Sequence, residues 1–136
     1  MLIRHSFLSL GLLLLIISCS PPPRLIVKIQ GNITYDGEPV EVGIISFLPI
    51  EGKGVSGGGP ITKGKYYVDP DVRLLPGTYR VEIRWPKPTG EINKEAGYGQ
   101  SPIVVAEAIP EKYNKESILT AEVEAGENVI HFHLEK

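Results

Sequence analysis

The sequence predicts an all-β fold, a β-sandwich of roughly seven short strands. Its 15 glycines and 12 prolines lie between short runs rich in β-branched residues, as in chains of strands and tight turns. Residues 78–85 alternate strictly between apolar and polar side chains, which indicates a strand with one buried face. No segment has the 3.6-residue periodicity of an amphipathic helix. These observations together exclude a helical bundle.

The first half of the domain reads as strands separated by turns and one loop. Residues 25–35 are rich in β-branched side chains and end at Asp36-Gly37, a strong turn pair. Residues 42–48 follow as a strand that places Gly43, Ile45 and Phe47 on one face. Residues 51–60, "EGKGVSGGGP", have too little side chain to pack a core, and we expect a mobile loop there.

The next segments contain the clearest strand and the longest expected loop. Residues 61–68 predict a hairpin arm with a Lys63-Gly64 turn. The strand at 78–85 directs Tyr79 into the core, where its hydroxyl is expected to reach a loop carbonyl, and Pro86 and Pro88 end this strand. Residues 86–102 predict a long loop, and loops of that length are often functional.

The C-terminal part completes the predicted sheet. Residues 109–114 predict a turn packed on the sheet edge, and residues 117–124 and 128–134 are the last two strands. Gly31 and Gly43 lie within strands, which favours a bulge or a close backbone approach at each.

Three motifs in order carry a family resemblance: residues 31–40 "GNITYDGEPV", residues 64–66 "GKY" and residues 75–81 "LPGTYRV". They resemble the carboxypeptidase regulatory-like domain, a transthyretin-like or prealbumin-type β-sandwich. The ending, with "IPEKYN" at 109–114, is similar to that of small lipoproteins of planctomycete-type bacteria that carry this domain. The resemblance covers residues 25–134 and implies a seven-stranded Greek-key sandwich without catalytic residues of its own.

The N-terminus predicts export and lipidation. Arg4, the apolar run at 7–17 and the small Ser18 form a signal-peptide pattern that is too short for a transmembrane helix. Residues 16–19, "IISC", resemble the lipobox of bacterial lipoproteins, which implies that Cys19, the single cysteine, carries a diacylglycerol. The alternative is an ordinary cleaved signal peptide with a free thiol. Ser20 in place of an aspartate favours the outer membrane.

The predicted organisation is therefore a signal peptide at 1–18, a lipidated cysteine with a proline-rich spacer at 19–24, and one β-sandwich at 25–136. The spacer prolines favour a stiff polyproline segment that holds the domain off the lipid. The formal net charge of −2, with no basic patch, argues against a nucleic-acid partner.

Two sets of side chains are candidates for a site. Trp85, Tyr98 and Tyr113 lie at or near the long loop, where their rings could stack on a sugar or grip a peptide; alternatively, they pack the core and hold loops. His131 and His133 share one strand face with Glu135 and could bind a metal such as zinc; alternatively, they form the solvated face of the last strand.

The preferred function is a lipid-anchored, non-enzymatic binding or assembly module at the cell envelope, without a cofactor. Its expected partners are the membrane, through the anchor, and an envelope protein or carbohydrate. The alternative is a small metal-dependent or hydrolytic enzyme that uses His131 and His133. Residues 54–58, "GVSGG", have the Gly-x-Ser-x-Gly spacing around Ser56, but no helical segment follows them, so the strand–turn–helix elbow of a serine hydrolase is not predicted.

Overall fold

The computed structural model describes residues 25–52 and 54–136, so Cys19, the signal peptide and the spacer lie outside the described residues. Within this part of the chain there is no α-helix, and the prediction of an all-β fold is confirmed. No helix among these residues has the length and apolar character needed to cross a membrane. The strands are β1 (Val27–Tyr35), β2 (Glu38–Pro39), β3 (Val42–Pro49), β4 (Gly57–Thr62), β5 (Lys65–Val68), β6 (Gly77–Arg84), β7 (Pro86–Ile92), β8 (Ile103–Glu107), β9 (Thr120–Val123), β10 (Gly126–Val129) and β11 (Phe132–Leu134), with 3₁₀ turns η1 (Pro70–Val72) and η2 (Glu111–Tyr113).

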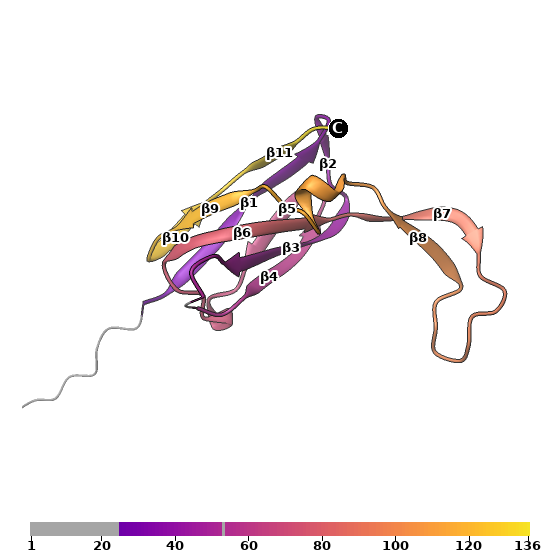
Figure 1. Ribbon diagram of the computed structural model, residues 1–136, viewed down its shortest axis with the longest axis horizontal. Helices are drawn as coiled ribbons and strands as arrows, with labels where there is room; N and C mark the ends of the chain where they lie inside the picture. Colours follow the sequence, from indigo (N-terminus) through magenta and orange to yellow (C-terminus); the bar gives the residue numbers. More distant parts are fainter. Residues whose placement is uncertain (1–24, 53) are drawn as a thin grey trace, which may run out of the picture.

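Nine of the strands form one sheet with the order β10-β1-β5-β4-β3-β6-β9, to which β2 and β11 add along β1 (Figure 1). The sheet curls into a half-barrel around a single core. β1 pairs with four other strands, because its first half pairs with β10 and β5 and its second half pairs with β11 and β2. The first strand of the domain is thus joined to the last ones.

Two tight turns set the register of neighbouring strands. Asp36 and Gly37, with φ values of 49° and 83°, join β1 to β2, and Lys63 and Gly64, with 51° and 74°, join β4 to β5. Positive φ at both central residues is the type I′ geometry, whose twist matches that of the flanking strands. Both turns were predicted from the sequence.

The core follows the predicted alternation. Tyr79, Val81 and Ile83 of β6 are at most 1% exposed, whereas Thr78, Arg80 and Glu82 between them are only partly buried. The Tyr79 hydroxyl donates to the Leu75 carbonyl at 2.7 Å and accepts the Leu75 N–H at 3.2 Å. The predicted bond from this hydroxyl to a loop carbonyl is confirmed, and it fixes the chain where it enters β6.

The predicted close approaches at Gly31 and Gly43 are also confirmed. A Cβ at Gly31 would overlap the Ile130 carbonyl oxygen, and one at Gly43 would overlap that of Arg84. The Tyr66 hydroxyl donates to the same Ile130 carbonyl at 2.9 Å, and burial raises its pKa well above the usual range. This phenol therefore stays protonated and remains a donor at neutral pH.

The expectation of a long loop at 86–102 is wrong. Pro86–Ile92 forms β7, which pairs with β8 in a two-stranded arm that projects from the main sheet (Figure 1). Pro86 and Pro88 do not end strand structure, because β7 is an edge strand and a proline nitrogen can face away from its partner. Only residues 93–102, at the tip of the arm, lack strand structure.

Two further expectations are corrected. The loop predicted at 51–60 is half strand, because Gly57–Pro60 belongs to β4 and pairs with residues 44–47 of β3. The single strand predicted at 128–134 is interrupted at 130 and 131, since β10 and β11 pair with different halves of β1. The Ile130 N–H still bonds the Gln30 carbonyl at 2.9 Å across this interruption.

Candidate functional site

A groove of about 730 Å³ crosses the outer face of the sheet over β1, β5 and β4. Alternation along the strands determines which side chains reach it: Ile29, Ile33, Tyr66 and Val68 point to the core, and their neighbours point outward. The side chains that line the groove include those of Gln30, Asn32, Lys65, Tyr67, Asp69 and His131.

The floor of the groove along β4 is backbone. Gly58, Gly59 and Pro60 line it. A Cβ at Gly58 would overlap the Ile45 carbonyl oxygen, and one at Gly59 would overlap that of Tyr67, so the neighbouring strands approach too closely for a side chain. Glycines within a strand commonly mark a place where another backbone or a ligand approaches closely.

The walls of the groove offer neutral polar groups beside one aromatic ring. Tyr67 is 46% exposed. Among the residues that the structure describes, the side-chain amides of Gln30 and Asn32 make no hydrogen bond to the protein, so each can both donate and accept. Lys65 and Asp69 contribute one charge of each sign. The groove therefore suits an uncharged ligand with many hydroxyl or amide groups.

The two histidines lie on one solvent-exposed side, as the non-metal alternative predicted, while Phe132 and Leu134 are buried. The Nδ1 atom of His131 accepts the Asn32 N–H at 3.0 Å, and that of His133 lies 2.9 Å from the Thr34 hydroxyl. The neutral His131 ring must carry its proton on Nε2, which makes this atom a donor in a residue that lines the groove. No cluster of three possible metal ligands occurs in residues 25–52 and 54–136.

The three aromatic candidates have separate positions. Trp85 is 6% exposed, with its ring edge-on to Tyr35 at 6.5 Å, and Lys87 Nζ lies 3.6 Å from its centre. Tyr113 is 8% exposed, and its hydroxyl accepts the Glu135 N–H at 3.1 Å. Tyr98 is fully exposed at the tip of the arm. Trp85 and Tyr113 thus pack the core and hold loops.

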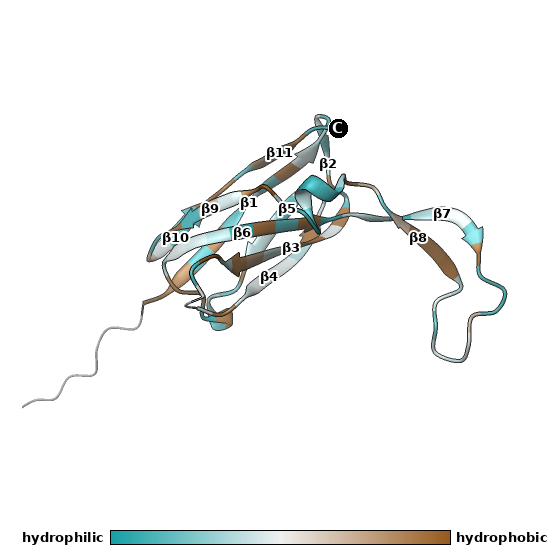
Figure 2. Ribbon diagram, viewed as in Figure 1, coloured by the Kyte–Doolittle hydropathy of each residue, from teal (hydrophilic) through white to brown (hydrophobic). Residues whose placement is uncertain are grey.

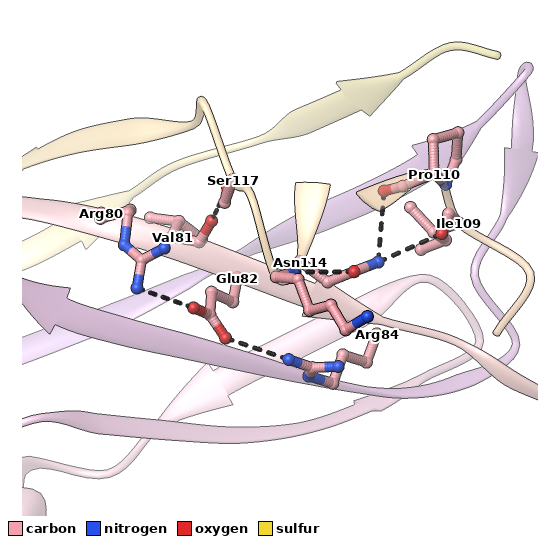
Figure 3. Close-up of polar contacts among 9 residues, drawn as sticks. Arg80, Val81, Glu82, Arg84, Ile109, Pro110, Asn114 and Ser117 are labelled. Atoms are coloured by element: carbon pink, nitrogen blue, oxygen red, sulfur yellow. Dashed lines mark hydrogen bonds and ion pairs between the residues drawn. The ribbon is translucent and has the colours of Figure 1, made fainter. Parts of the chain in front are cut away.

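A second polar cluster fixes the segment around η2, and Ser117 joins this segment to β6 (Figure 3). The Asn114 side chain, only 2% exposed, donates to the carbonyls of Ile109 and Pro110 at 3.1 and 3.2 Å and accepts the Lys115 N–H at 2.8 Å. The Ser117 hydroxyl donates to the Val81 carbonyl. These contacts satisfy every buried polar atom of Asn114, which makes it a structural residue.

On the outer face of β6, Glu82 accepts from Arg80 at 2.9 Å and from Arg84 at 3.4 Å (Figure 3). Positions two apart on a strand share a face, so these three side chains form a row. Both guanidinium groups are engaged by the one carboxylate and are about two-fifths exposed. Half-exposed ion pairs of this kind stabilise little and do not define a site.

Comparison with known proteins gives no relative of this chain: no family model matches it, and neither a curated protein nor a solved structure matches it. The groove was not predicted from the sequence, although Gln30, Asn32 and the glycines at 58 and 59 are among its components. The missing information was the pairing of β1 with β5, which places Gln30 opposite Tyr67.

Proposed function

We propose that this protein is a lipid-anchored, non-enzymatic binding module of the bacterial envelope, and that its groove binds a neutral saccharide. The finer fold behind this proposal is the seven-stranded Greek-key sandwich of the carboxypeptidase regulatory-like family, as carried by small planctomycete-type lipoproteins. The motifs at 31–40, 64–66 and 75–81 support that membership, and the lipobox at 16–19 supports the anchor.

The observation that carries the ligand class is the composition of the groove. A pyranose ring has an apolar C–H face and a rim of hydroxyl groups that both donate and accept. The exposed ring of Tyr67 can stack on the C–H face, and the amides of Gln30 and Asn32 can form hydrogen bonds with the hydroxyl groups. Lys65 and Asp69 carry opposite charges, so the groove has no net preference for a phosphate or a cation. A flat glycine floor leaves room for a ring.

The orientation of the domain is consistent with this role. The proposed anchor at Cys19 precedes Leu25 by six positions, and an extended segment of that length spans at most about 20 Å. The start of β1 would therefore lie close to the lipid surface. The arm lies at the other end of the domain and would point away from the membrane (Figure 1).

The anchor is tested by expressing the wild type and Cys19→Ala in a bacterial host. We expect a wild-type chain that begins at Cys19, carries added acyl mass and fractionates with membranes. In Cys19→Ala the acyl mass and the membrane association should both be lost, because the variant has no thiol to carry the diacylglycerol. A wild-type product without acyl mass would contradict the anchor while leaving the groove proposal intact.

The ligand is tested by calorimetric titration of the full chain in detergent with chitotriose and maltotriose. We expect at least one of them to bind, and Tyr67→Ala to weaken that binding about tenfold, since one stacking ring is worth about 1.4 kcal/mol. Tyr98→Ala is the matched control, because it removes an exposed tyrosine on the arm. The saccharide proposal fails if neither sugar binds, or if Tyr98→Ala weakens binding as much as Tyr67→Ala.

A further inference from the structure

The arm formed by β7 and β8 has two open edges. The prolines of β7 prevent its outer edge from pairing with a further strand. In the register Pro86 is opposite Glu107, Lys87 opposite Ala106 and Pro88 opposite Val105. Successive antiparallel pairs alternate between hydrogen-bonded and non-bonded ones. Because proline has no N–H, the pairs of Pro86 and Pro88 must be the non-bonded ones. Their nitrogens face outward, so the edge of β7 lacks donors at both positions.

The edge of β8 has the opposite character. By the same alternation, the N–H and C=O groups of Ile103, Val105 and Glu107 point away from β7. Two bonds support this assignment: the Ala108 N–H donates to the Trp85 carbonyl at 3.0 Å, and the Val104 carbonyl accepts from the Thr89 hydroxyl at 3.2 Å. Residues 104 and 108 thus face β7. The Ile103 N–H donates to the Ser101 hydroxyl at 3.2 Å, so the outer edge of β8 offers the N–H and C=O groups of Val105 and Glu107 and the C=O group of Ile103.

This edge also lacks the charges that usually prevent strands from pairing. The outermost strands of the main sheet carry exposed glutamates, Glu122 on β9 and Glu127 on β10. Residues 103–106 of β8 are uncharged, and Figure 2 shows a hydrophobic strand on the projecting arm. Glu107 is turned back, since its carboxylate accepts the N–H groups of Trp85 and Ile109 at 2.8 and 3.2 Å.

One face of the arm also carries exposed apolar side chains. Directly opposite residues share a face, so Pro88 and Val105 lie on the same side as Ile92 and Ile103. Ile92, Ile103 and Val105 are 60%, 51% and 54% exposed. An isolated two-stranded sheet is only marginally stable in water, and further strands are needed to stabilise it.

We propose that β8 pairs antiparallel with β8 of a second copy of this chain, about a two-fold axis at Val105. The two arms then form one four-stranded sheet. The strand is complementary to itself: Val105 faces its own copy, Ile103 faces position 107, and no like charges meet because the Glu107 carboxylate is bonded within its own arm. The saccharide groove lies on other strands, so this inference does not depend on it.

The geometry is tested by cysteine cross-linking of the full chain in cells. A hydrogen-bonded antiparallel pair has a Cα separation of about 5.5 Å, within the range for a disulfide. Val105→Cys should therefore give a covalent dimer on mild oxidation. Ala106→Cys is the matched control, because residue 106 would face position 104 and the two new thiols would lie too far apart. The wild type, with Cys19 alone, is the blank.

The contribution of the edge is tested by sedimentation of the detergent-solubilised full chain. We expect a wild-type dimer, and dissociation at least tenfold more favourable in Val105→Pro. This variant removes an outward donor and leaves the pairing with β7 and the thermal unfolding unchanged. A wild-type monomer, a dimer that Val105→Pro does not weaken, or equal cross-linking at 105 and 106 would each overturn the proposal. A covalent adduct with a different protein in place of the dimer would overturn it as well.

Discussion

Gly31→Ala is expected to destabilise the domain by about 3–5 kcal/mol, or to prevent its folding. The new Cβ would overlap the Ile130 carbonyl oxygen, which is backbone and cannot rotate away. The segment between β10 and β11 must then move. Its movement breaks the bonds of Ile130 to the Gln30 carbonyl and to the Tyr66 hydroxyl, each 2.9 Å long. Overpacking costs about 1–3 kcal/mol, and each lost hydrogen bond costs about 1 more.

Denaturant unfolding of the variant beside the wild type measures this loss as a lower midpoint. Gly97→Ala is the matched control, because its φ is not in the left-handed region and the nearest side-chain atom to a new Cβ lies at 3.8 Å. We expect that variant to stay within about 0.5 kcal/mol of the wild type. A Gly31→Ala midpoint as high as that of Gly97→Ala would show that the approach of Ile130 is not required.

Asn114→Asp is expected to cost about 3–4 kcal/mol at neutral pH, although it changes a single atom. The amide of Asn114 donates to two carbonyl oxygens from an almost fully buried position. A carboxylate there would direct negative charge at both oxygens and could donate to neither. The segment around η2 would loosen first, because the bonds of this side chain join residues 109, 110 and 115.

The pH dependence of Asn114→Asp has a defined sign. Burial and the facing carbonyls favour the protonated acid and raise the pKa of the new group above its ordinary value of about 3.9. The folded state then binds the proton more tightly than the unfolded one, so the stability deficit grows as pH rises above about 4. Unfolding at several pH values should show the gap to wild type narrowing in acid.

Asn93→Asp is the control for this substitution. Asn93 is exposed, and its side-chain oxygen accepts the Glu95 N–H at 3.0 Å, which a carboxylate does equally well. We expect no change beyond about 0.5 kcal/mol. An Asn114→Asp variant as stable as Asn93→Asp at neutral pH would contradict the role assigned to the buried amide.

The faces of the main strands could be predicted from the sequence because burial on one side of a sheet imposes a period of two. Tyr79, Val81 and Ile83 follow it, as do Ile45 and Phe47 on β3. The two type I′ turns were also predictable, since only a few residue pairs tolerate positive φ at both positions. Each of these features depends on residues that are adjacent in the chain.

The arm and the strand at Gly57–Pro60 were missed because their cause lies elsewhere in the chain. A proline ends a strand only where the sheet needs a backbone N–H at that position. Whether position 88 needs one depends on its register with Val105. The glycines of β4 are strand residues because Ile45 and Tyr67 approach their backbone. Local composition shows neither the register of Pro88 nor the close approach to the β4 glycines, because prolines and glycines are also typical of loops.

The candidate groove was only partly predictable for the same reason. Alternation along 25–35 places Gln30 and Asn32 outward, but their meeting with Lys65 and Tyr67 requires the pairing of β1 with β5. Among the aromatic candidates, Trp85 continues the buried face of β6, so its core role follows from the strand pattern. Tyr98 alone among those three is exposed to solvent.

The pairing of β1 with the last two strands has a kinetic consequence. Ile29 is opposite Asn128 and Ile33 is opposite Phe132, so the first strand is completed by residues about a hundred positions later. Sheets built from such distant pairs fold in milliseconds to seconds, because a long loop must close before any contact rewards it. Synthesis of the last strand is thus the event that permits closure. A chain that ends before β10 would leave one side of β1 as an open edge and be prone to aggregate.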